Sequence, residues 1–561
     1  MDFDWLDNMF FSESNPVIPL DLREVNLTSM DLTGDLTTLM KENRDRERLA
    51  LSNLQIKEFP KIKQGIDEFK SLYLENCQII SFENFEKVFS NLTEMKIVNC
   101  KLKEIPDCFQ KLKNLKVVDF TGNEIKIIPQ FIQKMSSIEQ FSVGGNQIKK
   151  LENLNWKHIS ILNLENNKLH GYPKQSISNS ILSLNLSNNI IGFIANDIKY
   201  IPSIQNLILN NCGLEIFPTP ILSLKNLKVL DLSNNRLLNI HSFEKEENNY
   251  LQQLEELKMD NCNLKKKIRI SFKNLKKLSL RNNELTHFPF WVPNSICKIS
   301  EIDVSNNLIQ NVSKISFFSN LKNLILKNNK IEDLEETFSS LTQLTYVDAS
   351  YNLIGQLPSI TSKQIVSLIL CRNRINEIET FDGLEVLKNL DLSYNKIKKL
   401  PNCSSLKSLK FLDLSNNELE NIEESLYFCN QISSLNLSSN FIQELSKHIQ
   451  NLNNLKIFDC QVNDIQNLPL EIIKLENLTK FKATFNPCCL TVDQKITTWF
   501  HNKRNLTYNL KFPEIINFWE GLYVGHFCYL RSKSHLEKLG VTDVISIDIP
   551  NVSNNVKELF F

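Results

Sequence analysis

The sequence contains no apolar run that approaches the roughly 20 residues needed for a membrane-spanning helix. It also has no net charge, because 64 basic side chains balance 64 acidic ones. A balanced chain offers no bulk charge to the phosphates of a nucleic acid or to an anionic membrane surface. We therefore expect neither a membrane span nor a nucleic-acid partner.

Paired cysteines and a basic N-terminus are also missing. The first residues, MDFDWLDNMFFSES, are acidic and lack the basic start of a secretory signal. The 13 cysteines are odd in number and scattered, without the CxxC spacing of zinc sites or the pairing of a disulfide framework. Adjacent Cys488 and Cys489 differ from the spaced cysteine pairs of secreted repeat caps. These features predict an intracellular, cytoplasmic protein without a metal site.

Motifs for cofactors and catalysis are missing as well. The 13 glycines form neither a GxxxxGK[ST] loop nor a GxGxxG motif after a strand. The eight histidines are isolated, which is typical of surface or core residues rather than of a metal cluster. We therefore predict no cofactor and no catalytic residue.

A repeat is the dominant feature that is present. The segments VLDLSNNRL, FLDLSNNEL and NLDLSYNKI are variants of one template, LxxLxLxxNxL. The N position of this template recurs twenty times between Leu54 and Asn486, about 23 residues apart on average, as fifteen Asn, four Cys and one Leu. The pattern resembles the leucine-rich-repeat family over nearly the whole chain.

The template predicts an α/β solenoid, the leucine-rich-repeat horseshoe with a concave parallel β-sheet. Each LxL segment alternates inward leucines with outward residues, as a short strand does, and successive strands stack at about 4.8 Å. The segments between strands, such as KEIPDCFQKLKNL, predict short helical or 3₁₀ turns on the convex side, entered by proline. A chain of 561 residues fits such an array better than one globular core.

The residue at the N position is expected to turn inward. There its side-chain amide can satisfy backbone groups of its own turn and of the neighbouring turn. Cysteine buries well and donates weakly, so it is the usual replacement. Cys77, Cys100, Cys212 and Cys262 are therefore interpreted as ladder residues, not as metal ligands or nucleophiles.

The composition predicts four parts. Residues 1–46 form an acidic N-terminal segment and N-cap, with ten acidic and four basic side chains. Residues 47–490 hold the repeats, and residues 491–511 form a C-terminal capping helix and linker. Residues 512–561 depart from the repeat pattern.

The opening acidic-aromatic segment, DFDWLDNMFF, has two interpretations. It can be a docking peptide that folds as a helix in a groove. It can equally pack on the end of its own solenoid. The sequence leaves both open.

A first candidate binding feature is a row of aspartates on the predicted concave face. Seven repeats carry Asp between the two strand leucines, at Asp119, Asp231, Asp303, Asp348, Asp391, Asp413 and Asp459. They predict an acidic stripe, in which Asp348, Asp391 and Asp413 are candidate partner-binding residues. The other interpretation is a solvated face with no role in recognition.

A second candidate lies directly before the ladder residue. Twelve of the twenty repeats have Asn there, whereas three consecutive repeats have Tyr351, Arg372 and Tyr394. On adjacent turns they would form a column with cation–π contacts, built from residue types enriched at interface hot spots. The other interpretation is a self-satisfied surface ladder. The binding interpretation predicts that changing both tyrosines to Ala weakens partner binding and leaves thermal stability nearly unchanged.

The C-terminal stretch FPEIINFWEGLYVGHFCYLRSKSHLEKLGVTDVISID predicts a strand at Leu522–Val524, a helix and a second strand. With its GLYVG and LGVTDVI motifs it resembles the entrance of a dual-specificity protein phosphatase domain. That family needs HCx5R for its chemistry, and no His is followed by Cys and no Cys has Arg six positions on. The resemblance therefore transfers no catalytic residue. Residues 512–561 are interpreted as a truncated phosphatase-like segment, and the chain as given is not predicted to be an enzyme.

Together these features predict an intracellular protein–protein interaction scaffold, active in signalling, that binds through its concave face and is monomeric. The alternative is the targeting portion of a leucine-rich-repeat dual-specificity phosphatase, acting on phosphotyrosine and phosphoserine or phosphothreonine, whose catalytic half is missing from this chain. A third interpretation is a purely structural repeat protein.

Overall fold

The computed structural model describes most of the repeat array. The described residues are 47–56, 59, 69–151, 158–172, 180–237, 251–265, 268–270, 272–291, 297–334, 338, 340–358, 360, 362–490, 492–510, 516–519 and 522–524. The predicted acidic segment 1–46 and most of the predicted phosphatase-like segment 512–561 lie outside the described residues.

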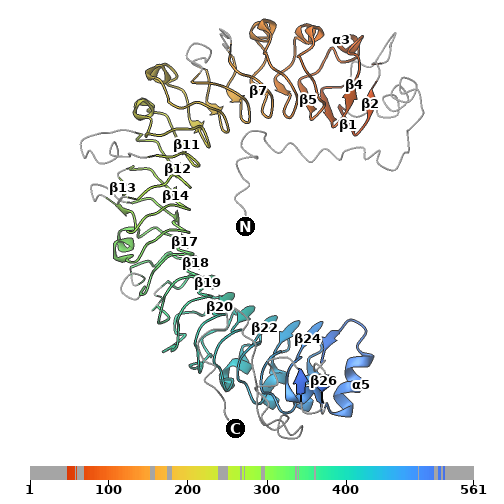
Figure 1. The fold of residues 1–561 in the computed structure, drawn as a ribbon, viewed down its shortest axis with the longest axis vertical. Helices are drawn as coiled ribbons and strands as arrows, with labels where there is room; N and C mark the ends of the chain where they lie inside the picture. Colours follow the sequence, from red (N-terminus) through yellow and green to blue (C-terminus); the bar gives the residue numbers. More distant parts are fainter. Residues whose placement is uncertain are drawn as a thin grey trace. The chain divides into compact units, whose positions relative to one another are not determined.

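The chain divides into two compact units. The first comprises Met1–Glu284 with Trp291–Ile299, and the second Leu285–Phe290 with Ser300–Phe561. Figure 1 shows that each unit repeats one motif, a short strand followed by a return segment. Within the described residues, twenty-one short strands form the parallel sheet, eleven of them in the first unit and ten in the second.

In the first unit the strands pair in chain order with matched register, so that Leu207 of one strand lies beside Leu184 and Leu230 of its neighbours. The strands are β1 (Arg48–Ser52), β3 (Ser71–Glu75), β5 (Glu94–Val98), β6 (Val117–Asp119), β7 (Gln140–Ser142), β8 (Ile161–Asn163), β9 (Ser183–Asn185), β10 (Asn206–Ile208), β11 (Val229–Asp231), β12 (Glu256–Lys258) and β14 (Lys277–Ser279).

The second unit continues the same arrangement, with Leu390 of one strand beside Leu368 and Leu412 of its neighbours. Its strands are β16 (Glu301–Asp303), β17 (Asn323–Ile325), β18 (Tyr346–Asp348), β19 (Ser367–Ile369), β20 (Asn389–Asp391), β21 (Phe411–Asp413), β22 (Ser434–Asn436), β23 (Ile457–Asp459), β24 (Lys480–Lys482) and β25 (Thr507–Asn509). From β16 to β24, the middle residue of each three-residue strand is buried in the core. The first and third face outward, and we call the surface that they form the open face of the sheet.

In the part of the chain that the structure describes, six further strands lie outside this sheet. They are β2 (Gln55–Ile56), β4 (Gln78–Ile79), β13 (Arg269–Ile270), β15 (Phe290–Trp291), β26 (Ile516–Trp519) and β27 (Leu522–Val524). β2 pairs with β4 in parallel, and β26 pairs with β27 in antiparallel. β27 matches the strand expected at Leu522–Val524, whereas the helix and second strand expected after it lie outside the described residues.

Where the described return segments are helical, they are mainly 3₁₀ helices, in line with the predicted short helical or 3₁₀ turns. They are η2 (Asp107–Lys111), η3 (Gln130–Lys134), η4 (Asn196–Tyr200), η5 (Thr219–Ser223), η7 (Ser313–Phe317), η8 (Glu424–Phe428), η9 (Lys447–Asn451), η10 (Leu470–Lys474) and η11 (Pro487–Leu490), with one short α-helix, α3 (Phe85–Val88). Prolines 106, 129, 218 and 469 stand directly before η2, η3, η5 and η10. Proline suits this place because its fixed φ fits a helix entrance and its missing N–H is not needed there.

A buried amide ladder joins neighbouring turns. The Asn417 Nδ2 group donates to the carbonyls of Leu392, Leu414 and Ser415 at 2.9, 3.0 and 3.3 Å. Its Oδ1 accepts from the N–H of Ile397 in the preceding turn at 3.0 Å. One side chain thus satisfies several backbone groups that would otherwise be buried without partners. The predicted inward position of the template Asn is confirmed.

Cysteine carries out part of the same role. Cys212 is fully buried and its Sγ donates to the carbonyl of Leu186 at 3.2 Å. Sulfur is a weak acceptor, and the N–H of Ile191 instead donates to the backbone carbonyl of Cys212 at 3.0 Å. Burial raises the pKa of the Cys212 and Cys262 thiols to about 12. Both thiols are therefore protonated at neutral pH and structural.

A helix closes the C-terminal end of the second unit. α5 (Gln494–Asn502) begins after Asp493, whose carboxylate accepts from the N–H of Lys495 at 2.7 Å. The Phe500 ring lies between Phe481 of the last turns and Tyr508 of β25, with ring centres 5.5 and 4.8 Å away. The helix thus covers apolar surface that the solenoid would otherwise expose.

The predicted α/β solenoid of the leucine-rich-repeat type is confirmed, with its parallel sheet and short 3₁₀ return segments. Over the described part of the chain, no helix has the length and apolar character to cross a membrane.

Candidate functional site

The backbone is left-handed at the residue directly before each ladder residue. In these positions φ is between 50° and 61° for the residues other than glycine, and Gly122 and Gly145 have φ of 73° and 64°. We call this set of stacked residues the left-handed column. Asn is common there because its short polar side chain tolerates this region better than most residues.

Some neighbouring Asn side chains of the column bond to one another. Asn211 Nδ2 donates to Asn188 Oδ1 at 2.8 Å, and Asn261 Nδ2 donates to Asn234 Oδ1 at 2.8 Å. These amides are exposed, and their stacking needs no other molecule. This part of the column is a self-satisfied ladder.

In the second unit, three successive positions of the column hold Tyr351, Arg372 and Tyr394, each with φ of 55°. The guanidinium carbon of Arg372 lies 5.2 Å from the ring centre of Tyr351 and 3.9 Å from that of Tyr394. Lys327 Nζ lies 5.5 Å from the Tyr351 ring on the preceding turn. The sequence pattern predicted these contacts between adjacent turns. We call the three residues the aromatic column.

Stability alone does not account for the aromatic column. A residue other than Gly, Asn or Asp in the left-handed region costs about 1–2 kcal/mol. An exposed cation–π contact contributes about 0.5–1 kcal/mol, which no more than offsets that cost. Tyr351 and Tyr394 are each 44% exposed. The column therefore holds large side chains at a surface where Asn would fold at least as well.

The three aspartate candidates lie beside this column, at the third position of β18, β20 and β21. In Asp348, Asp391 and Asp413, one carboxylate oxygen accepts from the N–H two residues further on, at 3.0, 3.0 and 2.9 Å. These side chains are half-buried. They thus hold the turn that leads into the left-handed column and still present charge on the open face.

The template aspartates of the first unit are buried, unlike Asp348, Asp391 and Asp413. Asp119 and Asp231 are 6% and 3% exposed, and burial raises the pKa of both carboxyls above the usual range. In the second unit Asp303 is also buried, and Asp459 pairs with Lys482 at 2.9 Å. Of the seven aspartates, Asp348, Asp391 and Asp413 remain as the accessible acidic stripe.

Sequence reasoning missed two apolar residues on the open face. Phe411 and Ile457 stand at the first position of β21 and β23 and are 53% and 41% exposed. Ser434 of β22 lies between them in register. Strand alternation could have found them, because the residue before an inward leucine must point outward.

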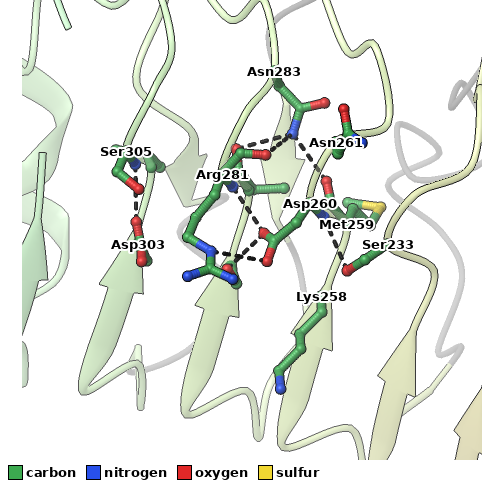
Figure 2. Close-up of polar contacts among 12 residues, drawn as sticks. Ser233, Lys258, Met259, Asp260, Asn261, Arg281, Asn283, Asp303 and Ser305 are labelled. Carbon is green, nitrogen blue, oxygen red and sulfur yellow. Dashed lines mark hydrogen bonds and ion pairs between the residues drawn. The ribbon is translucent and has the colours of Figure 1, made fainter. Parts of the chain in front are cut away.

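The first unit offers a contrasting polar cluster, shown in Figure 2. Arg281 Nε lies 3.1 Å from Asp260 Oδ2, while Asp260 Oδ1 accepts from the Ser279 hydroxyl at 2.6 Å and from the Arg281 N–H at 2.8 Å. Both charges are thus engaged within the sheet surface. The polar groups of this cluster bond to one another and stabilise their own turns. They are therefore less available to a partner than the side chains of the aromatic column.

The open face has the chemistry of recognition rather than catalysis. Aromatic rings, a guanidinium group, carboxylates and apolar side chains can together hold another protein. Within the described ranges, no group of three or more His, Cys, Asp or Glu side chains could hold a metal ion.

The model of the family described as "Leucine rich repeat" matches residues 297–354 and 363–419, and a second model of the same description matches residues 226–245. The matched residues include β16 to β21 and thus the aromatic column. They do not extend into residues 512–561.

Similar proteins carry the same repeat. Lumican of Oryctolagus cuniculus is 31% identical over 171 residues, which are 29% of this chain and 88% of the relative. Human podocan-like protein 1 is 29% identical over 230 residues, and the chain spans only 44% of its length. A leucine-rich-repeat protein of Leptospira interrogans has a similar structure, with a TM-score of 0.53 and 24% identity over 75% of this chain and 96% of that chain. The structural likeness shows the fold alone.

Proposed function

We propose that this chain, which belongs to the leucine-rich-repeat proteins, is an intracellular interaction scaffold in signalling that binds a protein partner. The binding surface is the open face of β18 to β23 together with the aromatic column. The chain acts as a monomer and binds without nucleic acid, metal or cofactor.

The observation that carries this proposal is the aromatic column itself. The left-handed positions of the aromatic column hold Tyr351, Arg372 and Tyr394, although Asn would have a lower conformational free energy there. Both tyrosine rings are exposed. This strain, together with the exposure of the rings, supports a role for these side chains besides folding. Tyr and Arg are the residue types that most often dominate binding energy at interfaces.

The neighbouring residues indicate the kind of partner segment that fits. Asp391 and Asp413 are register partners on adjacent strands, and like charges in such pairs repel each other. A Lys or Arg of the partner placed between them would relieve that repulsion. Phe411 on the same strand as Asp413 offers an apolar contact. We therefore propose a partner segment in which a basic residue is flanked by apolar ones.

The proposed intracellular location rests on the cysteines. The twelve described cysteines are free thiols, among them ladder residues such as Cys77 and Cys100. Reduced thiols suit a reducing compartment. Alkylation of the protein in intact source cells, with and without prior reduction, tests this point. Equal labelling of the cysteines with and without reduction supports the proposed intracellular location. Labelling of the cysteines only after reduction contradicts it.

The binding surface is tested by photo-cross-linking in the cells that make the protein. A photoreactive residue is placed at Phe411 on the open face, and in a second variant at Phe428, an exposed convex residue that serves as the matched control. We expect a cross-linked partner protein from position 411 that Tyr351→Asn with Tyr394→Asn abolishes. Partners captured only from position 428 would refute the proposal.

The alternative function is the targeting portion of a dual-specificity phosphatase. The GLYVG and LGVTDVI motifs favour it, and β27 lies at the strand that the resemblance implies. The decisive observation is an HCx5R motif in the coding sequence downstream of Phe561. Hydrolysis of an aryl phosphate by the purified chain would contradict the prediction that this chain is not an enzyme.

A further inference from the structure

A cavity of about 450 Å³ lies on the flank of the first unit, just beyond the ladder residues of three successive repeats. Its walls include Lys126, Lys149, Lys150 and Lys168, with Ile127 and Leu151 between them. We call this feature the lysine pocket. It belongs to the first unit, whereas the aromatic column belongs to the second.

The charges of the lysine pocket are only weakly balanced by the protein. All four lysines are exposed. Within the described part of the chain, Lys126, Lys149 and Lys168 form no ion pair. Lys126 and Lys149 occupy equivalent places in adjacent repeats, three residues after Asn123 and Asn146. Such stacked cations repel each other, and an anion between them removes the repulsion.

The pocket also has an apolar component. Ile127 is 65% exposed and stands among the lysines, whereas the next residue, Ile128, is buried in the core. A small inorganic anion would leave Ile127 uncovered. A peptide that brings both carboxylates and a large apolar side chain would match the charge and the exposed apolar surface together.

We propose that the lysine pocket binds the acidic-aromatic segment at residues 2–11 of this same chain. Residues 2–11 contain Asp2, Asp4 and Asp7 and no basic residue, interleaved with Phe3 and Trp5 among other apolar residues. The carboxylates pair with the lysines, and an aromatic side chain covers Ile127. This occupant is favoured because its charge and apolar content complement the pocket.

The length of the connecting chain permits this contact. Residues 12–46 connect the segment to Glu47 beside β1. Thirty-five residues span about 30–35 Å as a random coil. The pocket lies near β6 to β8, three to five strands from β1, which corresponds to about 15–25 Å along the sheet. A tether of this reach gives an effective concentration on the order of 1 mM, so even weak contacts are populated.

Carbodiimide cross-linking of the full chain tests the proposal, because this reagent joins carboxylates to lysines that contact them. We expect monomeric product in which Asp2, Asp4 or Asp7 is joined to lysines of the pocket, identified by peptide mass spectrometry. The double variant Lys126→Gln, Lys149→Gln should reduce this yield about tenfold. Thermal unfolding of the variant shows whether the fold is retained.

The chain provides a matched control. Lys396, Lys398 and Lys399 occupy the equivalent places after Asn395, on a single repeat of the second unit whose neighbouring repeats do not carry the same cluster. Lys398→Gln should leave the cross-link yield unchanged. Equal cross-linking to lysines throughout the chain would overturn the proposal.

Two other occupants give distinct results. If a second copy of the chain supplies the segment, the cross-linked product is dimeric and its yield rises with protein concentration, and the intramolecular proposal is wrong. If the pocket is a site for a phosphate group, 10 mM inorganic phosphate protects Lys126 and Lys149 from an amine-acylating reagent equally in the native chain and in an Asp2→Asn, Asp4→Asn, Asp7→Asn variant. That result would also overturn the proposal.

A synthetic peptide of residues 1–14 should bind the triple variant more tightly than the native chain, where the tethered segment competes.

Discussion

The guanidinium carbon of Arg372 lies 3.9 Å from the ring centre of Tyr394, closer than the 5.2 Å that separates it from Tyr351. The central residue of the aromatic column therefore interacts mainly with the turn that follows it. The Tyr351 ring also has Lys327 Nζ 5.5 Å from its centre, and Tyr351 and Tyr394 are each 44% exposed, so both rings remain available to a partner.

Replacing Tyr351 and Tyr394 by Asn tests whether the aromatic column serves binding or stability. Asn removes left-handed strain but also the cation–π contacts, two effects of about 1 kcal/mol each. We expect the denaturation midpoint to change little, while affinity for the partner falls about tenfold or more. Calorimetric titration with the partner protein that cross-linking identifies measures the change in affinity. Parallel losses of stability and affinity would indicate a structural column, and Ser439→Asn at the same column provides the control.

The buried carboxyl of Asp231 should lower stability at neutral pH. Burial raises its pKa in the folded state above the unfolded value of about 4. The full stability is present below pH 4, is lost as pH rises from there to the folded pKa, and stays lower above it. Asp231→Asn should remove this dependence and raise stability at pH 7, since Asn185 makes the equivalent bond to the N–H of Ser187. Unfolding followed from pH 3 to 8 tests this; a lower midpoint for the variant at pH 7 contradicts it.

The amide ladder predicts a graded response at Asn417. Asn417→Ala leaves the N–H of Ile397 and several carbonyls without partners and should cost about 2–4 kcal/mol locally. Asn417→Cys should cost less, because Cys212 shows how the backbone compensates. Hydrogen exchange by mass spectrometry over residues 390–420 measures the local effect. Asn416→Gly, a neighbouring change that the left-handed backbone tolerates, is the control.

The C-terminal helix should protect the last turns of the solenoid. Phe500 is 2% exposed and stacks between Phe481 and Tyr508, so Phe500→Ala removes a large buried ring and should cost about 3–5 kcal/mol. We expect faster hydrogen exchange in β23 to β25 with little change in the first unit. His501→Ala, an exposed residue of the same helix, is the matched control. Equal exchange in both variants would show that α5 is not a cap.

The repeat made most of the fold accessible to sequence reasoning. Each Asn or Cys of the ladder reports one turn, because few residues can be buried there and still satisfy the backbone. The aromatic column was also visible, since Tyr351, Arg372 and Tyr394 interrupt a run of Asn. The contacts between them follow from the spacing of adjacent turns.

Other parts of the site depend on the three-dimensional structure and could not be predicted from the repeat. Asp231 and Asp391 have the same place in the template, yet one is buried and the other half-buried, because the neighbouring side chains differ. The template does not encode that difference. The lysine pocket was not predicted from the sequence either, because Lys126, Lys149 and Lys168 are far apart in the sequence and come together only when three turns stack.

The left-handed column has an implication for evolution and for engineering. Its backbone is held by the amide ladder one residue further on, so a residue other than Asn is accommodated there at a cost of about 1–2 kcal/mol. Tyr, Arg, Ser, Val and Phe share this backbone geometry with the common Asn. New specificity can therefore arise by single substitutions, one turn at a time. Transfer of Tyr–Arg–Tyr to Asn188, Asn211 and Asn234 would build a second recognition surface on the first unit from the same scaffold.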